Sequence, residues 1–323
     1  MSASRRQPGS GYRARSPLQP ASRRRRRRTR RAGLTRLAIL LTFIAAVVAV
    51  LIVATSSGSG SSSNQAAQPP GKPTAGAHVP KHKASRSPST GGGATASTVE
   101  DRAINRVLAY SPFIKGGIPR KRVIALTFDD GPSPYTPQIV TILARMHVPG
   151  TFFVVGQQLN DFAAGLRDEL RHGFVVGDHT ENHAFLTHLS SSAQYRQLHD
   201  AAVRMTRLGA PFPRLFRPPY GAYNSGTLGV TKQLNMLMTL WSVDTRDWTR
   251  PGTRKIIRRA LSAAQPGAIV LMHDGGGNRS QTAAALPAII NGLRRRHYEL
   301  VTVPQLLRLD PPPRGQQLPH VSE

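Results

Sequence analysis

The segment VIALTFDDGP, residues 123–132, decides the fold of this chain. An apolar run leads into two adjacent carboxylates, Asp129 and Asp130, and Gly131-Pro132 then turns the chain, which is the pattern of a buried strand that ends in a turn. Two like charges at the end of a buried strand cost electrostatic energy. A metal ion, an arginine or a catalytic task usually offsets such a cost, although an acidic pair before a turn is by itself more often a helix cap.

Strand-like and helix-like segments alternate from about residue 118 onward. We predict strands at Val123–Phe128, Thr151–Val155, Phe174–Val176, Leu215–Phe216, Met236–Val243, Ala268–Met272 and Glu299–Val303. We predict helices at Thr136–Met146, Phe162–Arg171, Ser191–Leu208, Ser225–Leu234, Thr253–Ala264 and Thr282–Arg295, with caps at Ser190 and Thr253. Strands separated by helices predict an α/β fold with a parallel sheet or barrel.

Positive charge is concentrated at the N-terminus of this 323-residue chain, whose formal net charge is +28. Residues 1–36 contain thirteen arginines and no acid, whereas residues 101–323 contain 27 Lys/Arg and 15 Asp/Glu. About half of the excess charge therefore lies outside any predicted folded domain. The absence of cysteine fits an exported protein without disulfides, although it is weak evidence alone.

Residues 37–54, LAILLTFIAAVVAVLIVA, predict a membrane-spanning helix of roughly 27 Å. Arginines precede this segment and nothing comparable follows it, so the positive-inside rule predicts a basic cytoplasmic tail at 1–36, a single-pass signal-anchor in the cell membrane at 37–54 and an extracellular folded domain. A cleaved signal peptide that releases a secreted protein is the competing interpretation, but its apolar core normally has about 7–15 residues. Beside a membrane span, the arginine run is expected to set topology and contact anionic lipid headgroups rather than bind nucleic acid.

The remaining sequence divides by composition. Residues 55–117 are predicted to form a disordered linker and lead-in, because residues 55–100 are rich in Ser, Gly, Pro, Ala and Thr and lack apolar periodicity. The folded domain is predicted at 118–310 and a disordered tail at 311–323.

Four more polar clusters follow predicted strands. HTENH at 179–183 places two imidazoles four residues apart, and on one helical turn they would face the same way, as two metal ligands must. The others are RPPYG at 217–221, DTRDW at 244–248 and LMHD at 271–274. Each has an ordinary alternative: solvent-facing histidines, a rigid Pro-Pro turn, an acidic cap and a strand-end histidine satisfied by a neighbour.

The positions of these clusters favour a shared site. Five polar groups come directly after different predicted strands, namely Asp129/Asp130, His179, Arg217, Asp244 and His273. In a parallel α/β fold the C-terminal ends of the strands meet on one face, where active sites are built. We therefore expect the five groups to gather around one cleft.

In order and spacing, TFDDGP, HTENH, RPPYG, DTRDW and LMHD resemble the five motifs of the polysaccharide deacetylases, carbohydrate esterase family four. The resemblance covers roughly residues 120–305. It implies a distorted (β/α) barrel of about seven parallel strands, in agreement with the predicted elements.

The resemblance also implies a metal-dependent hydrolysis. Asp130, His179 and His183 would bind one divalent ion, with Zn²⁺ expected and Co²⁺, Ni²⁺ or Mn²⁺ left open by the ligand types. Asp129 would be the general base, and the resemblance assigns Arg217 as the cation that holds it.

Further roles are implied on the substrate side of the site. The backbone N–H of Tyr220 would stabilise the oxyanion, and Trp248 and Leu271 would form a pocket for the acetyl methyl. His273 would be the general acid, with Asp247 as the carboxylate that raises its pKa. One residue departs from the family pattern: Asp178 stands where Asn is common, which would make the metal site more anionic or leave the extra carboxylate facing away.

The expected substrate is an N-acetylated glycan polymer, with peptidoglycan favoured by the predicted anchor and linker. Chitooligosaccharides, poly-N-acetylglucosamine and a non-sugar amide remain alternative substrates. A tethered glycan-binding module is the non-enzymatic alternative. Binding of anionic wall polymers by the basic chain would be compatible with catalysis.

Overall fold

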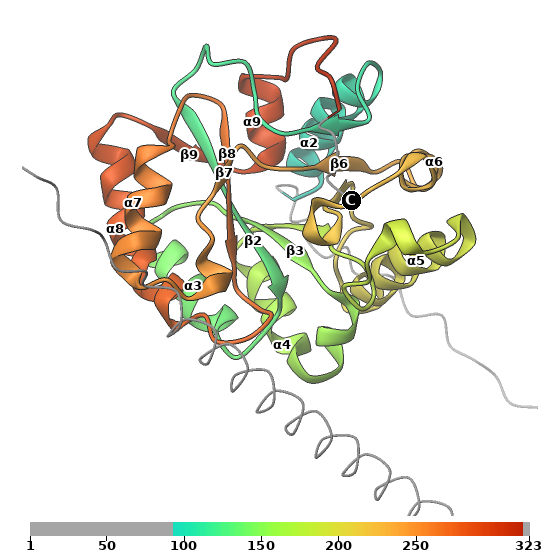
Figure 1. The fold of residues 1–323 in the computed structure, drawn as a ribbon, viewed down its shortest axis with the longest axis horizontal. Coiled ribbons are helices and arrows are strands. Elements are labelled where there is room, and N and C mark those ends of the chain that lie inside the picture. Colours follow the sequence, from blue (N-terminus) through green and yellow to red (C-terminus); the bar gives the residue numbers. More distant parts are fainter. Residues whose placement is uncertain (1–92, 319–323) are drawn as a thin grey trace, which may run out of the picture. The chain divides into compact units, whose positions relative to one another are not determined.

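A curled sheet of nine strands forms the centre of the computed structural model, which describes residues 93–318 (Figure 1). Its order is β1-β6-β5-β4-β3-β2-β8-β7, and β9 also pairs with β2. The strands are β1 (Phe113–Ile114), β2 (Val123–Gly131), β3 (Thr151–Val154), β4 (Val175–Asp178), β5 (Leu215–Phe216), β6 (Leu237–Thr239), β7 (Val243–Asp244), β8 (Ala268–His273) and β9 (Glu299–Val301). All ladders between these strands are parallel. The α/β class and parallel sheet predicted from the sequence are confirmed, and the curled shape fits a distorted barrel. The sheet has nine strands rather than about seven, because β1 was not predicted and one predicted strand is divided into β6 and β7.

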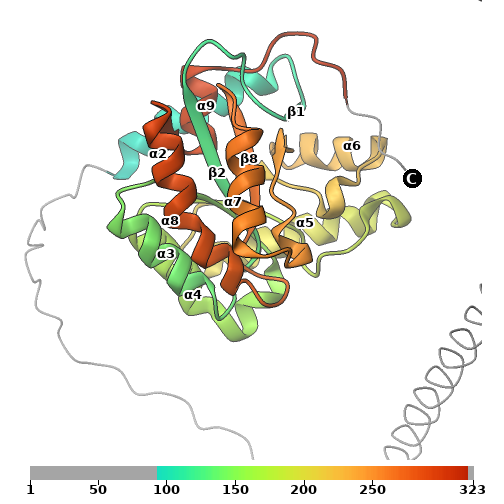
Figure 2. The same cartoon turned by 60° about the vertical axis from the view of Figure 1, so that its left-hand side comes forward.

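Helices follow most strands and cover the sheet (Figures 1 and 2). They are α2 (Gly93–Leu108), α3 (Thr136–Arg145), α4 (Leu159–Arg171), α5 (Ser191–Arg207), α6 (Ser225–Gln233), α7 (Thr253–Ser262), α8 (Ser280–Arg295) and α9 (Val303–Leu309). Helices α7 and α8 lie side by side in both views and pack together, as do α2 and α9.

The central strand β2 is buried on both faces, which explains its continuous apolar run. Ile124, Leu126 and Phe128 pack in a core with α3, α7 and α8. Val123 and Ala125 pack in a second core with neighbouring strands, α2 and α9. This alternation follows from the two-residue period of a strand, and it places each residue of β2 on a defined face.

Two predicted strands end earlier than the sequence indicated. The segment predicted at Met236–Val243 is two strands, because β6 pairs with β5 and β1 whereas β7 pairs with β8. Between them, the carbonyls of Thr239 and Leu240 accept hydrogen bonds from Arg217. The segment predicted at Glu299–Val303 leaves the sheet at Thr302, whose side chain caps α9 by accepting from the backbone N–H of Gln305.

Of the two predicted helix caps, one is confirmed and one is wrong. The side chain of Ser190 accepts a hydrogen bond from the backbone N–H of Ala193 at the start of α5. Thr253 is instead the first residue of α7, and Gly252 is its N-cap, without a side-chain hydrogen bond.

The described fold extends beyond the boundaries predicted at residues 118 and 310. Helix α2 buries Ala103, Ile104 and Val107 against the core, so residues from 99 to 117 belong to the fold rather than to a linker. At the other end, the carbonyl of Pro312 accepts a hydrogen bond from the hydroxyl of Tyr110, which attaches the start of the predicted tail.

The basic tail at 1–36, the anchor at 37–54 and the linker up to residue 92 lie outside the described residues, as do residues 319–323. Within residues 93–318, no helix is both long and apolar enough to cross a membrane.

Candidate active site

The polar strand ends meet at one cavity of about 450 Å³. Asp129 and Asp130 lie in the last residues of β2, Asp244 and His273 end β7 and β8, and His179 follows β4 directly. The residues that line the cavity include Asp129, Asp130, His179, His183, Pro218, Tyr220, Trp241, Asp244, Trp248, Leu271, His273, Gly276 and Arg279. The convergence expected from the sequence is therefore present, with Arg217 and Asp247 one layer behind the lining residues.

A backbone irregularity lets both carboxylates of the Asp pair face this cavity. Strict alternation along β2 would turn the side chain of Asp130 to the face opposite that of Asp129. The register between β2 and β3 shifts between Asp129 and Gly131, and Asp130 has a left-handed φ of +71°. A bulge of this kind re-aims a side chain at a strand end, and here it brings Asp130 beside two histidines.

Asp129 is held by a buried arginine. Nη1 of Arg217 donates to Oδ1 of Asp129 at 2.7 Å and to the hydroxyl of Thr127 at 2.8 Å. The guanidinium carbon lies 4.1 Å from the ring centroid of Phe153, and the arginine side chain is fully buried. Burial lowers the pKa of Arg217, although Asp129 raises it, and the guanidinium stays the cation that fixes this carboxylate.

Asp130, His179 and His183 form a cluster whose possible ligand atoms all lie within 4.8 Å of one another. Oδ1 of Asp130 is 3.4 Å from Nε2 of His179 and 3.2 Å from Nε2 of His183. The histidines are not on a helical turn as predicted, because the segment between them is irregular and Thr180 and His183 have φ values of +70° and +58°. The left-handed residues, rather than helical periodicity, bring the two imidazoles together.

This cluster fits a divalent cation. Nδ1 of His179 lies 2.7 Å from the carbonyl oxygen of Arg217, which can only accept a hydrogen bond, so Nδ1 carries the proton. In the neutral form of the ring, Nε2 then has a free lone pair that faces Asp130. Oδ1 of Asp130 is buried without a hydrogen-bond partner. Hydrogen-bond acceptor atoms that face one another with no proton between them can serve as the ligands of a metal ion. One carboxylate with two imidazoles suits zinc.

Tyr220 supports His183 from outside the cluster. Its hydroxyl lies 3.1 Å from Nδ1 of His183, and its ring stacks on Phe185 with centroids 5.0 Å apart. Phe185 stacks in turn on His188 at 4.6 Å. A partner on the outer nitrogen fixes the tautomer of a histidine that binds a metal through its other nitrogen.

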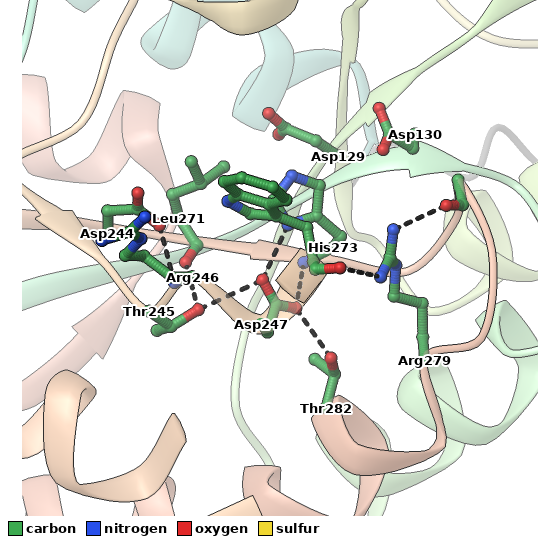
Figure 3. Close-up of polar contacts among 12 residues, drawn as sticks. Asp129, Asp130, Asp244, Thr245, Arg246, Asp247, Leu271, His273, Arg279 and Thr282 are labelled. Atoms are coloured by element: carbon green, nitrogen blue, oxygen red, sulfur yellow. Dashed lines mark hydrogen bonds and ion pairs between the residues drawn. The ribbon is translucent and has the colours of Figure 1, made fainter. Parts of the chain in front are cut away.

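His273 and Asp247 form a second polar group across the cavity (Figure 3). Nδ1 of His273 lies 2.7 Å from Oδ1 of Asp247, whose Oδ2 accepts from the backbone N–H of His273 at 2.9 Å and from the Thr282 hydroxyl at 2.7 Å. Burial lowers the pKa of His273, but the hydrogen bond and charge of Asp247, with the charges of Asp129 and Asp130, raise it to about 9. The imidazole is therefore positively charged at neutral pH.

The predicted substrate-binding residues lie around the same opening. Leu271 is 4% exposed, whereas Trp248 is 50% and Tyr220 is 63% exposed. Tyr220 has a left-handed φ of +61°, an uncommon conformation for a large side chain. Asp178 takes no part in the cluster, since its Oδ1 accepts from the backbone N–H of Thr180 at 2.7 Å.

Two further buried residues lie near the site: Arg279, which was not predicted, and Asp274, the last residue of the LMHD cluster. Arg279 lines the cavity and donates from Nη2 to the carbonyl of Gly276 at 2.7 Å, which ties it to the glycine-rich segment at 275–277. Asp274 accepts a hydrogen bond from the hydroxyl of Thr136 and lies against the turn that follows β2. A single arginine outside any motif, such as Arg279, carries no sequence signal for such a role.

Known proteins resemble this chain in sequence and in structure. Residues 116–239 match the polysaccharide deacetylase family. The chain is 37% identical over 191 residues to a peptidoglycan-N-acetylglucosamine deacetylase of Bacillus cereus, covering 58% of this chain and 89% of the relative. It is 36% identical over 208 residues to a chitooligosaccharide deacetylase of a Bradyrhizobium strain, covering 59% of this chain and 93% of the relative.

Structural similarity agrees with this match. A crystal structure of a peptidoglycan N-acetylglucosamine deacetylase superposes with a TM-score of 0.60 at 30% identity, covering 64% of this chain and 97% of that one. The chain therefore belongs to the polysaccharide deacetylase family, carbohydrate esterase family four, and is a hydrolase.

Proposed function

We propose that this protein removes N-acetyl groups from N-acetylglucosamine-containing polysaccharide, with peptidoglycan as its substrate. The observation that carries the proposal is the arrangement around one cavity of a possible metal cluster, a carboxylate held by arginine and an imidazolium held by a carboxylate. These are the parts that hydrolysis of an amide by an activated water requires.

Asp130, His179 and His183 would hold one divalent ion, most naturally Zn²⁺, with Co²⁺, Ni²⁺ or Mn²⁺ as alternatives. When bound, the ion supplies Lewis acidity, which polarises the acetyl carbonyl and lowers the pKa of water.

Asp129 acts as the general base in this proposal. Its Oδ1 is engaged by Arg217 at 2.7 Å, which orients the carboxylate. Its Oδ2 lies 3.8 Å from Nε2 of His179 and so faces the ligand cluster. That oxygen takes a proton from the attacking water while the water oxygen bonds to the acetyl carbon.

The negative charge that develops on the acetyl oxygen needs a donor. We assign the backbone N–H of Tyr220, because its left-handed conformation at the edge of the cavity orients the peptide differently from a regular strand end. Trp248 and Leu271 enclose the acetyl methyl between an indole ring and a buried side chain.

His273 acts as the general acid. Its pKa of about 9 keeps the imidazole protonated at neutral pH, and its Nδ1 is engaged by Asp247. Nε2 is therefore the nitrogen that donates a proton to the sugar amine as the carbon–nitrogen bond breaks.

The choice of peptidoglycan rests on the names of relatives and on the predicted anchor. One relative is a peptidoglycan-N-acetylglucosamine deacetylase and another is a chitooligosaccharide deacetylase. An N-terminal anchor with the catalytic domain outside the membrane would place the site next to the cell wall. Chitooligosaccharide, poly-N-acetylglucosamine and a non-sugar amide are the alternative substrates.

Acetate release by the purified full chain with Zn²⁺ tests the proposal. Peptidoglycan, chitotetraose, poly-N-acetylglucosamine and a simple N-acetyl amino acid are compared, and fastest release from peptidoglycan is expected. Release from none of the three glycans would overturn the proposal, and release from the amino acid alone would assign the protein as a non-sugar amidase.

A further inference from the structure

Among the chain segments that contribute residues to the cavity, exposed positive charge is concentrated in one. Among the loops that line the cavity, those at residues 179–190, 218–224 and 240–242 contain no lysine or arginine. In the loop at 274–279 the arginine is Arg279, which is buried against backbone carbonyls. The segment from β7 into the first turn of α7, in contrast, has four exposed cations, here named the cationic rim: Arg246, Arg250, Arg254 and Lys255.

The fold does not use the charges of the cationic rim. Within residues 93–318, no carboxylate oxygen lies within 4.0 Å of any of the four charged groups. The two acids of the same segment are engaged elsewhere, because Asp244 accepts from the backbone N–H of Arg246 and Asp247 binds His273. Helix electrostatics does not explain Arg254 and Lys255, since positive charge is unfavourable in a first helical turn.

The cationic rim is continuous with the active site. Arg246 and Arg250 stand two residues before and after Trp248, which lines the cavity and is half exposed. Helix α7 begins three residues after Arg250, and its first turn has Arg254 and Lys255, both exposed. The four cations thus lie within seven residues of Trp248 along the chain.

We propose that the cationic rim binds carboxylates carried by the glycan, so that the enzyme selects anionic N-acetylated strands over neutral chitin-like ones. The inference rests on the proposed deacetylase function and narrows its substrate to peptidoglycan, in which the lactyl group of muramic acid and the peptide stem supply carboxylates. Arginine is suited to this task because its guanidinium forms paired, charge-assisted hydrogen bonds with a carboxylate. A neutral polymer offers the rim no counter-charge.

Binding to matched ligands tests this proposal. The ligands are soluble, uncrosslinked peptidoglycan strands and the same strands with their carboxylates amidated. The full chain is compared with the triple variant Arg246→Gln/Arg250→Gln/Arg254→Gln. The control is Arg145→Gln/Arg167→Gln/Arg196→Gln, which removes three exposed arginines from α3, α4 and α5 and changes the net charge equally.

At about 50 mM salt, the wild type and the control should bind native strands about tenfold more tightly than amidated strands, and the rim variant should bind both alike. The preference should shrink at about 300 mM salt because screening weakens exposed ion pairs. A rim variant that keeps the preference, or a wild type that has none, would overturn the proposal.

Acetate release separates this proposal from the function on which it rests. Charge-dependent binding without acetate release from either ligand contradicts the deacetylase function and leaves the rim assignment standing. Equal binding and equal acetate release for native and amidated strands contradict the rim and leave the deacetylase function standing.

Discussion

Asp129 and Asp130 are adjacent in the chain, yet their carboxylates have different partners. Oδ1 of Asp129 lies 2.7 Å from the buried guanidinium of Arg217, whereas Oδ1 of Asp130 lies 3.2 and 3.4 Å from Nε2 of His183 and His179. The bulge at the end of β2 makes this separation possible, because without it the two side chains would point to opposite faces of the sheet. One carboxylate is thus available to a metal and the other to a water molecule.

The hydroxyl of Tyr220 should strengthen metal binding through His183. Removing it in Tyr220→Phe leaves the Nδ1 of His183 without its partner at 3.1 Å, and metal affinity should fall by about tenfold or more. Competition with a chromophoric chelator measures this affinity. Tyr195→Phe is the matched control, because the ring of Tyr195 likewise contacts a histidine, His199, with centroids 5.1 Å apart, outside the site. Equal affinities for the Tyr220 variant and the wild type would show that the hydroxyl has no such role.

Asp247 should set the alkaline limit of activity. Because His273 must be protonated to act as an acid, kcat should fall as pH rises through its pKa of about 9. In Asp247→Asn the hydrogen bond and charge that raise this pKa are lost, so the fall should move to lower pH. The pH dependence of kcat measures the shift.

Asp200→Asn is the control for this shift, since Asp200 forms a similar pair with Nδ1 of His199 at 3.0 Å, outside the site. If kcat falls at the same alkaline pH in Asp247→Asn and in the wild type, His273 is not the general acid.

Asp274 should make stability depend on pH. Burial raises the pKa of its carboxyl to about 7, with Thr136 opposing and Asp130 adding to the rise, so the folded state holds a proton that the unfolded state releases near pH 3.8. A raised carboxyl pKa gives stability that is fully present below the unfolded pKa and is lost as pH rises towards 7. Asp274→Asn should therefore gain stability relative to wild type between about pH 4 and pH 7, by at most about 1.4 kcal/mol per pH unit.

Urea unfolding of both proteins at several pH values, with chelator present, measures this difference in the free energy of unfolding. A difference that does not change with pH would mean that Asp274 is ionised in the folded protein throughout this range.

The sequence was sufficient to predict the sheet and most of the site for one physical reason. Parallel strands are buried on both faces, so their apolar runs stand out, and polar residues directly after them must lie on one edge. Asp129 and His273 illustrate this, since each ends a buried strand and both line the cavity.

The features that could not be predicted depend on local backbone geometry. The left-handed conformations of Asp130 and His183 bring the possible ligands together, and although Asp and His adopt this conformation more often than most residues, only a small fraction of them do so. The run Met236–Val243 looked like one strand because its apolar pattern continues past the point where Arg217 binds the carbonyls of Thr239 and Leu240. The membrane anchor at 37–54 stays a prediction.

Measuring metal binding and turnover separately tests most directly whether Asp129 is the base and Asp130 the metal ligand. Asp129→Asn should retain one metal ion per chain, measured by elemental analysis after dialysis, and should lose acetate release by at least about a hundredfold. Asp130→Asn should bind the metal more weakly, because it removes the anionic member of the ligand cluster. Acetate release by Asp129→Asn at a rate close to that of the wild type, or loss of its metal, would contradict the assignment of Asp129 as the base and Asp130 as the ligand.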